Sequence, residues 1–573
     1  MAKTDLVLLH APSVYDFREK AILYGPVSDV IPSTQIFEMY PIGFMTMLQH
    51  LQEHGYNVRI INVALQMLRS RRFNVEKLIQ SLRTKAFGID LHWLVHAQGS
   101  LELASLVKRC HPTTPVIFGG LSASYYHEEL IAYPQIDYVI RGDSAEEPLR
   151  QLMGSITADR SPADVANLTW QQDGETRVNA ISHTPKDLDA VSFDYRKMMR
   201  STVRHRDLFG HLPFKDWLNY PIVVGLSCRG CVHRCVTCGG SASAFVRICE
   251  RHSPAFRGPE KLAEDIGTTA RTIKAPIIIL GDILQAGEDS AIRFLRALGA
   301  QKVTNHVAFE FFTPPPRSLL EEAARAVPNF NIQMSPESHD VNVRRRFGRN
   351  YDNDALEAVI EDAFELGCGR FDVFFMIGLP EQTVESVRGT IDYCESLLSR
   401  FDARFPKRLL PFISPLAPFL DPGSDAFEEP DRFGYRLFCR TLEEHRRALL
   451  EPSWKRVLNY ETEWMTRDEI ALSTYEAAHA LNRLKANYGV IQPHVANQVE
   501  QRIEAEREIM HGIDAILASA PRDEQKGRIE DLMRRFNHIG PSTLCDKNEM
   551  KWPARFYRFS PLRVLRSALF RRS

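Results

Sequence analysis

Four cysteines lie close together in the middle of this chain, in the stretch LSCRGCVHRCVTCGG at residues 226–240. They are Cys228, Cys231, Cys235 and Cys238, so eleven positions hold four of the ten cysteines of the 573-residue protein. A structural zinc site usually takes two cysteine pairs that are separated by a dozen or more residues. Only three residues separate Cys231 from Cys235, and this crowding favours an iron-sulfur cluster, whose irons accept thiolates at short and uneven spacings.

The remaining cysteines are scattered singly along the chain. A disulfide framework is therefore not expected, and we interpret them as small core residues. They are Cys110, Cys249, Cys368, Cys394, Cys439 and Cys545.

A series of strands that alternate with helices begins at Pro221, and these elements must position the cysteine loop. The strand candidates are PIVVGLS (221–227), PIIILGD (276–282), HVAFEFF (306–312), NFNIQMS (329–335), RFDVFFMIG (370–378) and KRLLPFIS (407–414). Six such units predict a partial (β/α)6 barrel, with the active site where the strands end. The cysteine loop directly follows the first of these strands.

The segment before the barrel predicts a second α/β domain. Between residues 4 and 155, five short apolar runs alternate with helical patterns. The expected fold is a doubly wound parallel sheet of the flavodoxin or Rossmann type, with a ligand crevice at the carboxyl ends of the strands. We therefore expect this domain at 1–155, a linking segment at 156–215, the barrel at 216–424 and a mainly helical C-terminal domain at 425–573.

The amino-acid composition of the chain indicates which classes of partner to expect. The chain is 44% hydrophobic and 25% charged, and its 71 Lys and Arg nearly balance its 72 Asp and Glu, so nothing points to nucleic acid. The start of the chain lacks a signal-peptide pattern and no apolar run is long enough to span a bilayer, so we expect a cytoplasmic protein. Residues 551–573 hold seven Lys or Arg and no acid. This basic tail either docks on its own domain or contacts an anionic membrane.

The spacing Cys231-x3-Cys235-x2-Cys238 resembles the signature of the radical S-adenosylmethionine (radical SAM) superfamily, and its place after the first barrel strand matches too. The resemblance implies that these three cysteines hold a 4Fe-4S cluster whose fourth iron binds SAM. It also implies cleavage of SAM to a 5'-deoxyadenosyl radical and an electron donor such as flavodoxin or ferredoxin. Cys228 departs from the pattern, and we interpret it as a bystander at the barrel rim. If it bound the fourth iron, the protein would instead be an electron-transfer or sensor protein.

The resemblance extends to residues that would contact SAM. Glu337 in SPES and Arg349 in RRRFGRN would bind its polar groups, although a surface pair within a solvated charge run is the alternative interpretation. Asp372 lies two positions before the place where the family often has an acid. The full set of predicted SAM contacts is Gly239, Gly240, Gly281, Asp282, Glu337, Arg349, Asp372 and Gly378.

The stretches PVIFGGLSASYYHEEL and IDYVIRGDSAEEPLRQL resemble the second half of the cobalamin-binding domain that precedes some radical SAM barrels of the class B methylase type. Gly119, Gly120 and Ser122 would then lie against the nucleotide tail of cobalamin. The Asp-x-His-x-x-Gly motif that supplies a cobalt ligand in many such domains is absent. His92 and His96 are either neighbours of a ligand or ordinary hydrogen-bonded histidines.

These features predict a cobalamin-dependent radical SAM methyltransferase that acts on an unactivated carbon of a small-molecule or lipid substrate. A radical SAM enzyme that catalyses cyclisation, coupling or rearrangement is the alternative. The stretch PLAPFLDPGSDAF at 415–427 either lines the mouth of the site or forms a rigid exit from the barrel.

Overall fold

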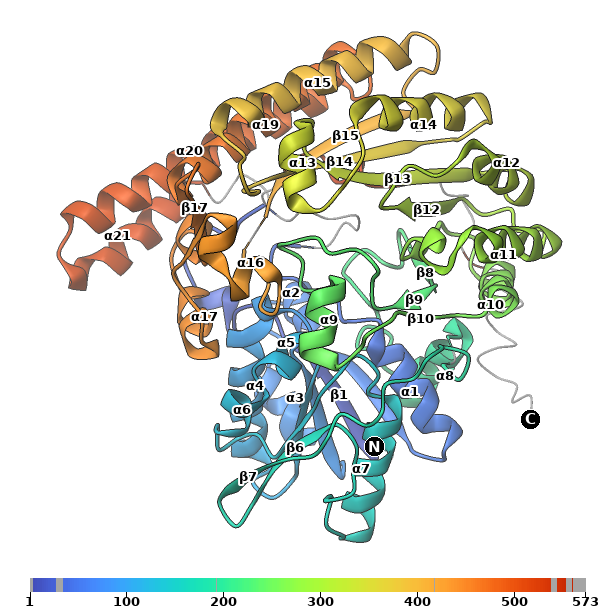
Figure 1. The fold of residues 1–573 in the computed structure, drawn as a ribbon. Coiled ribbons are helices and arrows are strands. Elements are labelled where there is room, and N and C mark those ends of the chain that lie inside the picture. Colours follow the sequence, from blue (N-terminus) through green and yellow to red (C-terminus); the bar gives the residue numbers. More distant parts are fainter. Residues whose placement is uncertain are drawn as a thin grey trace.

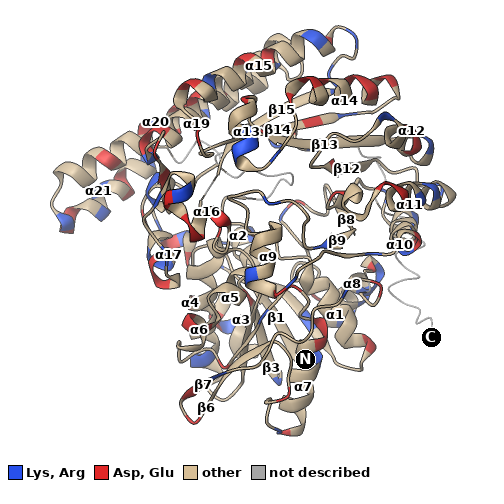
Figure 2. Cartoon of the chain, in the orientation of Figure 1, with Lys and Arg blue, Asp and Glu red and all other residues tan. Residues whose placement is uncertain are grey.

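The computed structural model describes residues 4–26, 34–191, 193–416, 418–536, 544–552 and 559. An N-terminal α/β domain packs against a partial barrel, and a helical C-terminal region contacts both (Figure 1). Basic and acidic residues are interspersed along the outer helices (Figure 2), which agrees with the balanced composition. None of the described helices is long and apolar enough to cross a membrane.

The N-terminal domain is built on a seven-stranded sheet in the order β2-β1-β3-β4-β5-β6-β7. Its first five strands are parallel, as the sequence predicts: β1 (Leu6–His10), β2 (Val58–Asn62), β3 (Ala86–Asp90), β4 (Val116–Gly119) and β5 (Tyr138–Ile140). The strand order reverses between β1 and β3. In doubly wound sheets this switch point is where ligands bind.

Helices cover both faces of this sheet. Along β1, Leu6 and Leu8 join one core cluster, while Val7 and Leu9 join the other, because successive strand residues point to opposite faces. The covering helices are α1 (Gly43–Glu53), α2 (Val63–Arg69), α3 (Val75–Ser81), α4 (Ala97–Cys110), α5 (Leu121–Tyr125), α6 (His127–Ile131) and α7 (Glu146–Ala158).

The segment expected to link the two domains extends the sheet. Strands β6 (Leu168–Gln172) and β7 (Glu175–Val178) form an antiparallel hairpin on the edge of β5. Their turn, Asp173–Gly174, has two positive φ angles of 55° and 81°, as a two-residue hairpin turn requires. Helix α8 (Tyr195–His205) then leads toward the barrel.

The barrel sheet holds six parallel strands in chain order, which confirms the predicted partial barrel. The strands are β8 (Val223–Leu226), β11 (Ile277–Leu280), β12 (Val307–Phe311), β13 (Phe330–Glu337), β14 (Phe371–Ile377) and β15 (Leu409–Pro415). The helices that follow them include α10 (Pro259–Thr272), α11 (Glu288–Ala300), α12 (Arg317–Ala326), α13 (Val341–Phe347), α14 (Asn353–Glu365) and α15 (Val384–Asp402). Strand register places Glu310, Gln333 and Asp372 in one row across three strands.

The C-terminal region is mainly helical, as expected. Its elements are α16 (Asp425–Glu428), β16 (Tyr435–Leu437), α17 (Leu442–Ala448), α18 (Trp454–Val457), β17 (Tyr460–Thr462), α19 (Arg467–Asn487), α20 (Pro493–Ser519) and α21 (Arg522–Arg535). Helix α19 packs on α15 and β15, and α17 packs on α4 of the N-terminal domain. The predicted basic tail lies outside the described residues, apart from Lys551, Trp552 and Phe559.

Candidate functional site

The cysteine loop is closed at its base by a short antiparallel ladder. Strand β9 (Cys228–Arg229) pairs with β10 (Ala255–Phe256), and the Arg257 N–H donates to the Ser227 carbonyl over 2.8 Å. The chain between them carries the cysteines and helix α9 (Ala242–Cys249). Because β9 directly follows β8, the whole loop lies at the carboxyl end of the barrel (Figure 1).

Three thiols of this loop form one group. Backbone N–H groups donate to two of them, from His233 to Cys231 Sγ over 3.4 Å and from Gly240 to Cys238 Sγ over 3.3 Å. Desolvation is the main cause that raises the pKa of Cys235 to about 11, and the nearby Cys231 thiol contributes to this rise. The pKa of Cys238 is raised mainly by desolvation, and the Cys235 and Cys231 thiols raise it as well. Thiol ligands with N–H groups directed at sulfur are the donor set of an iron-sulfur cluster.

Within the described chain, no group of three or more His, Cys, Asp or Glu side chains is arranged to hold a single metal ion. The cysteines of a 4Fe-4S cluster bind different irons, so a cluster does not need such a group. The three cysteines therefore fit a cluster as a donor set on one loop.

Cys228 has different surroundings from the other three. A Cβ placed on Gly281 would lie 2.6 Å from Cys228 Sγ, so the thiol packs directly against the turn that follows β11. The thiol donates to the Gly230 carbonyl over 3.8 Å. Desolvation raises its pKa to about 11, with a contribution from Cys231. The structure thus places Cys228 at the barrel rim, at the base of the loop.

The end of α13 supports the loop from the barrel side. The Val236 N–H donates to the Phe347 carbonyl over 2.9 Å, and Cys235 packs with Phe347 in a small apolar cluster. Gly348 follows with a φ of 116°, and a Cβ there would lie 2.9 Å from the Arg234 carbonyl oxygen. A glycine is therefore required where the helix meets the loop.

A segment after the last barrel strand holds the loop from the other side. We call residues 419–428 the strap. The Gly239 N–H donates to Asp421 Oδ2 over 2.9 Å, and the Ala426 N–H donates to the Val236 carbonyl over 2.8 Å. At the start of the strap, Phe419 joins a core cluster of the N-terminal domain. The sequence left residues 415–427 as either a lining of the mouth or a rigid exit from the barrel, and the structure shows residues 419–428 in contact with both domains.

Acidic residues and one arginine converge beside the loop. Glu337 and Arg349 are each 6% exposed, so they are buried in the barrel and not a solvated surface pair. Arg349 Nη2 lies 3.9 Å from Glu337 Oε1, and its guanidinium carbon lies 4.6 Å from the Phe312 ring centre. Arg349 Nε is buried and has no hydrogen-bond partner among the described residues. This arginine therefore keeps a donor available for a ligand.

Two further carboxyl groups, those of Asp282 and Glu310, belong to the same group of side chains as Glu337 and Arg349. Asp282 accepts N–H groups from Leu284 (2.8 Å) and Phe312 (3.0 Å), which ties together the ends of β11 and β12. Glu310 is half-buried in the barrel lumen and accepts the Gly281 N–H over 3.4 Å. Sequence reasoning missed Glu310, although an acid that interrupts the apolar strand HVAFEFF is the signal that would have found it.

Desolvation dominates the electrostatics of these acids. It raises the pKa of Glu310 and of Glu337 to about 7 and that of Asp282 to about 6, and Arg349 opposes the shift at each. Glu337 also has a φ of 69°, next to an irregularity in the β13–β14 register. Positive φ in a residue other than glycine is a strained conformation of the kind that clusters at functional sites. The group of side chains beside the cysteine loop thus holds three carboxyl groups, those of Asp282, Glu310 and Glu337, and one fixed cation, Arg349.

Two of the predicted SAM contacts do not join this group. The Asp372 carboxylate pairs with Arg370 Nε at 2.6 Å, near the amino end of β14. Gly378 follows β14, but its N–H donates to Gln382 Oε1 and its carbonyl accepts from the Tyr435 hydroxyl, each over 2.8 Å. Both polar groups of its backbone are therefore engaged within the protein.

The switch point of the N-terminal sheet carries a buried histidine pair. His10 ends β1 and Asp90 ends β3, and His10 Nδ1 lies 2.9 Å from Asp90 Oδ1. The Nε2 atoms of His10 and His96 both lie within hydrogen-bond distance of the Phe37 carbonyl, at 3.1 and 2.9 Å. Desolvation lowers the pKa of His96 to about 4, so this imidazole is neutral at physiological pH.

Several polar atoms at this switch point have no partner. In the described part of the chain, Ser13 Oγ, Asp90 Oδ2 and His96 Nδ1 are buried and accept or donate no hydrogen bond. Buried polar atoms in native proteins are nearly always paired. These three atoms therefore fit a crevice that receives the polar groups of a ligand.

The predicted cobalamin contacts Gly119, Gly120 and Ser122 lie at the next strand end. A Cβ on Gly120 would lie 2.5 Å from His92 Cα, and φ at Gly120 is 120°. The Ser122 hydroxyl donates to the His92 carbonyl over 3.2 Å. These residues thus pack the loop after β4 directly on the loop after β3.

Two family models match the chain. The B12 binding domain matches residues 33–152, and the radical SAM superfamily matches residues 226–394. A search of curated proteins found no match.

Several solved structures have a fold similar to that of most of this chain. The radical SAM methyltransferase TsrM from Kitasatospora setae, with cobalamin and a [4Fe-4S] cluster, has a TM-score of 0.57 at 14% identity over 93% of this chain and 99% of that one. A second TsrM structure, with tryptophan and a SAM analogue, gives 0.56 at 12% identity over 86% and 90%. The cobalamin-dependent SAM radical enzyme OxsB gives 0.52 at 14% identity over 99% and 79%. Together with the two family matches, these similarities make this chain a member of the radical SAM superfamily, in the group that carries a B12-binding domain before the barrel.

Proposed function

We propose that this protein is a cobalamin-dependent radical SAM enzyme that transfers a methyl group to an unactivated carbon of a small-molecule substrate. The observation that carries the proposal is the grouping of Cys231, Cys235 and Cys238 beside buried Glu337 and Arg349, at the end of the barrel that contacts the B12-binding domain. The structures of TsrM and OxsB, which contain cobalamin, support the same assignment.

The cofactors would supply the chemistry: a reduced 4Fe-4S cluster gives the electron that cleaves SAM, and cobalamin carries the methyl group. The protein's task is placement. Three cysteines hold the cluster and leave one iron for SAM. Arg349 would bind the SAM carboxylate through its unpaired Nε, and Glu310 and Glu337 would accept hydrogen bonds from its amino group.

Charge in the barrel supports a cationic ligand. Asp282, Glu310 and Glu337 face a single arginine, so the described cluster has more carboxyl groups than cations. Desolvated carboxylates are costly unless a cation is close. SAM carries a sulfonium and an ammonium group, and its binding would therefore stabilise these acids in their ionised form.

The N-terminal domain would hold cobalamin at the switch point, against Ser13, Asp90 and His96. The loop after β1 is fixed in place, because Gln98 accepts from the Tyr15 N–H over 2.7 Å and a Cβ on Gly99 would lie 1.8 Å from the Pro12 oxygen. No histidine occurs in that loop, residues 11–20. The corrinoid would thus bind without a lower-face histidine from this position.

Anaerobic reconstitution tests the proposal. The protein should show cluster absorbance, bind hydroxocobalamin and, once reduced, convert SAM to 5'-deoxyadenosine and S-adenosylhomocysteine. Formation of 5'-deoxyadenosine without retained corrinoid would favour cyclisation, coupling or rearrangement. A cluster whose spectrum does not respond to SAM would favour an electron-transfer or sensor protein.

A reductant protein completes the proposed reaction. We propose a flavodoxin or a ferredoxin in the cytoplasm, which would dock at the cluster loop, where Val232 is 47% exposed. Lipid substrates remain an alternative through the basic tail, residues 551–573. Liposome sedimentation of the full chain and of a chain ending at residue 552 tests this alternative, and equal binding by both forms would contradict it.

A further inference from the structure

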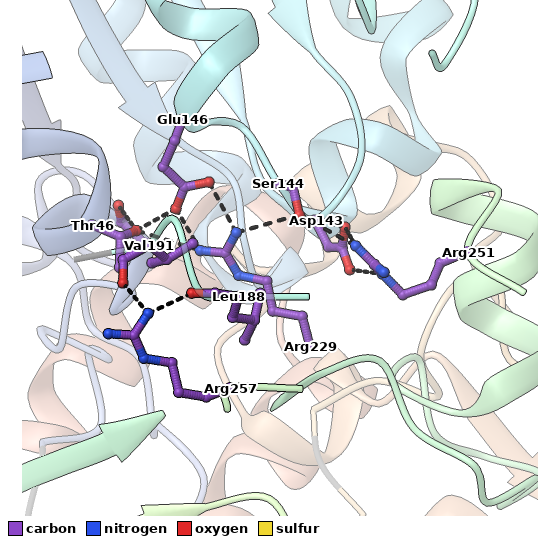
Figure 3. A network of polar contacts seen from close by, with 10 residues as sticks. Thr46, Asp143, Ser144, Glu146, Leu188, Val191, Arg229, Arg251 and Arg257 are labelled. Carbon is purple, nitrogen blue, oxygen red and sulfur yellow. Dashed lines mark hydrogen bonds and ion pairs between the residues drawn. The ribbon is translucent and has the colours of Figure 1, made fainter. Parts of the chain in front are cut away.

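The N-terminal domain and the cysteine loop meet at a buried network of arginines and carboxylates (Figure 3). Arg229 directly follows Cys228, and its side chain is only 11% exposed. Its guanidinium forms a two-pronged ion pair with Glu146 of α7, with Nη1 2.9 Å from Oε2. Glu146 also accepts a hydrogen bond from the Thr46 hydroxyl of α1. The pair therefore joins the base of the loop to two helices of the B12-binding domain.

A second ion pair lies beside the first. Arg251 pairs with Asp143 through both nitrogens of its fork, and these side chains are 2% and 7% exposed. The Ser144 hydroxyl lies 3.3 Å from both Arg229 Nη1 and Arg251 Nη2, and donates to Asp143 Oδ1 over 3.1 Å. Since Ser144 contacts both arginines, the two pairs form one unit.

Arg257 holds the far end of the loop to a different partner. It donates to the carbonyls of Leu188 (2.6 Å) and Val191 (2.8 Å), which belong to the linking segment (Figure 3). The B12-binding domain is thus held at Arg229 and Arg251, whereas the side-chain hydrogen bonds of Arg257 to described residues go to Leu188, Val191 and Asp265.

The loop that carries Asp143 and leads into α7 also reaches the turn after β4. The Gly142 N–H donates to Ser124 Oγ over 2.9 Å, and that hydroxyl donates to the Gly120 carbonyl over 2.7 Å. Two hydrogen bonds therefore connect Gly120 to Gly142, and the backbone from Gly142 to Ser144 then leads into the contacts with Arg229. One end of this path lies at the predicted cobalamin edge, and the other lies between Cys228 and Cys231.

We propose that Glu146, acting through Arg229, is a positioning residue for the cysteine loop, so that the B12-binding domain sets the geometry of the cluster and of the SAM site. The inference rests on the proposed function. Successive strand residues point to opposite sides, so in β9 the Cys228 thiol faces the barrel while Arg229 faces the other domain. A fork-shaped contact fixes direction as well as distance. Glu146 also neutralises the charge of Arg229, which directly follows Cys228 in the chain.

The test compares the reconstituted full-length protein with Glu146→Gln and with Glu147→Gln. Glu147 is the adjacent residue on α7, but its partners are Arg150 and His50, outside the network. Glu146→Gln leaves the Arg229 charge uncompensated, so the reduction potential of the cluster should become more positive. SAM affinity should fall about tenfold, the usual effect of losing an outer-shell partner. Glu147→Gln should change neither quantity.

A double variant covers the case in which Glu146→Gln does not fold. Glu146→Gln with Arg229→Gln has no unpaired charge, so its potential should be that of the wild type, while SAM affinity should still fall because the fork is lost. Two results would overturn the inference and leave the proposed function standing. One is a SAM affinity of the double variant equal to that of the wild type, and the other is equal effects of Glu146→Gln and Glu147→Gln. A wild-type protein that holds no cluster would overturn the proposed function, and the inference with it.

Discussion

The four clustered cysteines differ in what surrounds their sulfur atoms. Cys231 and Cys238 accept backbone N–H groups, whereas Cys228 packs on the Gly281 turn and donates to a carbonyl. The spacing in the sequence predicts three cluster ligands and one bystander, because three of the four cysteines match one signature. Spacing could not show the surroundings of Cys228, since these depend on the turn of another strand.

Alanine substitution separates the two classes of cysteine. Cys228→Ala should keep the iron content and the cluster absorbance of the wild type, because the other three thiols remain as ligands. Cys235→Ala should lose most of the iron, since a ligand is removed from the cluster. Iron and sulfide analysis of anaerobically reconstituted protein measures both. Equal loss of iron in the two variants would indicate that Cys228 is a ligand and that the cluster is saturated.

The raised carboxyl pKa values predict that SAM binding depends on pH. A pKa near 7 at Glu310 and Glu337 means that both are largely protonated at pH 6 and ionised at pH 8. A cationic ligand favours the ionised form, so SAM affinity should rise as pH increases through 7, by about tenfold per group. Titration of the cluster signal with SAM at pH 6, 7 and 8 measures this change.

Variants separate this effect from the titration of SAM itself. Glu310→Gln should bind SAM more weakly at pH 8 and show a flatter dependence on pH, because one titrating group is lost. Glu321→Gln changes a partly exposed residue on α12, which pairs with Arg325, and serves as the matched control. An unchanged pH profile in Glu310→Gln would exclude this carboxyl group as the cause.

Residue types alone could not have found the network at Arg229. The sequence showed an arginine within a cysteine motif and two glutamates at a helix start, which are usually solvated charges. Their pairing depends on how two domains dock, across 83 positions of the chain. The same limit explains why Asp421 was not assigned, since Gly239 lies 182 positions away from it.

Secondary structure was predictable where apolar periodicity was strong. All six barrel strands lie within the predicted ranges or shifted by at most two residues, because each is an apolar run bounded by Gly, Pro or charged residues. The exception is the end of β13. A proline at 336 normally ends a strand, yet β13 continues to Glu337 through an irregular register. Such bulges redirect a side chain, here the Glu337 carboxyl group.

The hairpin β6–β7 shows the opposite case. Its Asp-Gly turn was visible in the sequence as QQDGE, but β7 is exposed and carries few apolar residues. A strand with little to bury gives no periodic signal, so the segment read as a linker.

The strap predicts an effect on cluster lifetime. Asp421→Ala removes the acceptor of the Gly239 N–H next to Cys238, so the cysteine loop should open more often. Loss of cluster absorbance in the presence of a chelator should become several-fold faster. Asp421→Asn keeps an acceptor oxygen and should stay close to the wild type.

Asp431→Ala is the control for the strap, since Asp431 is exposed and lies just beyond it. Global stability should change little in all three variants, because the altered contact is local. If Asp421→Ala bleached no faster than Asp431→Ala, the strap would not act on the cluster.

Across the whole molecule, the two proposed cofactor sites are joined by two routes of direct contact. One leads from Gly120 through the hydrogen bonds of Ser124 and the backbone at Gly142 to the ion pairs of Arg229 and Arg251. The other is the strap, which reaches from Phe419 in the N-terminal core to Gly239. Sites joined in this way should share a coupling free energy, and binding linkage makes that energy reciprocal.

Reciprocity gives a prediction that is independent of catalysis. Hydroxocobalamin should bind more weakly to a Cys231→Ala/Cys235→Ala/Cys238→Ala protein than to the cluster-loaded wild type, by about fivefold or more if the coupling lies in the usual range. Titration of corrinoid fluorescence quenching in both proteins measures the ratio of their hydroxocobalamin affinities, with the cluster and without it. In Glu146→Gln, which breaks one of the two routes, the ratio should move toward one, whereas Glu147→Gln should keep the wild-type value. Equal corrinoid affinity with and without the cluster in the wild type would show that the two sites bind independently, despite the contacts between them.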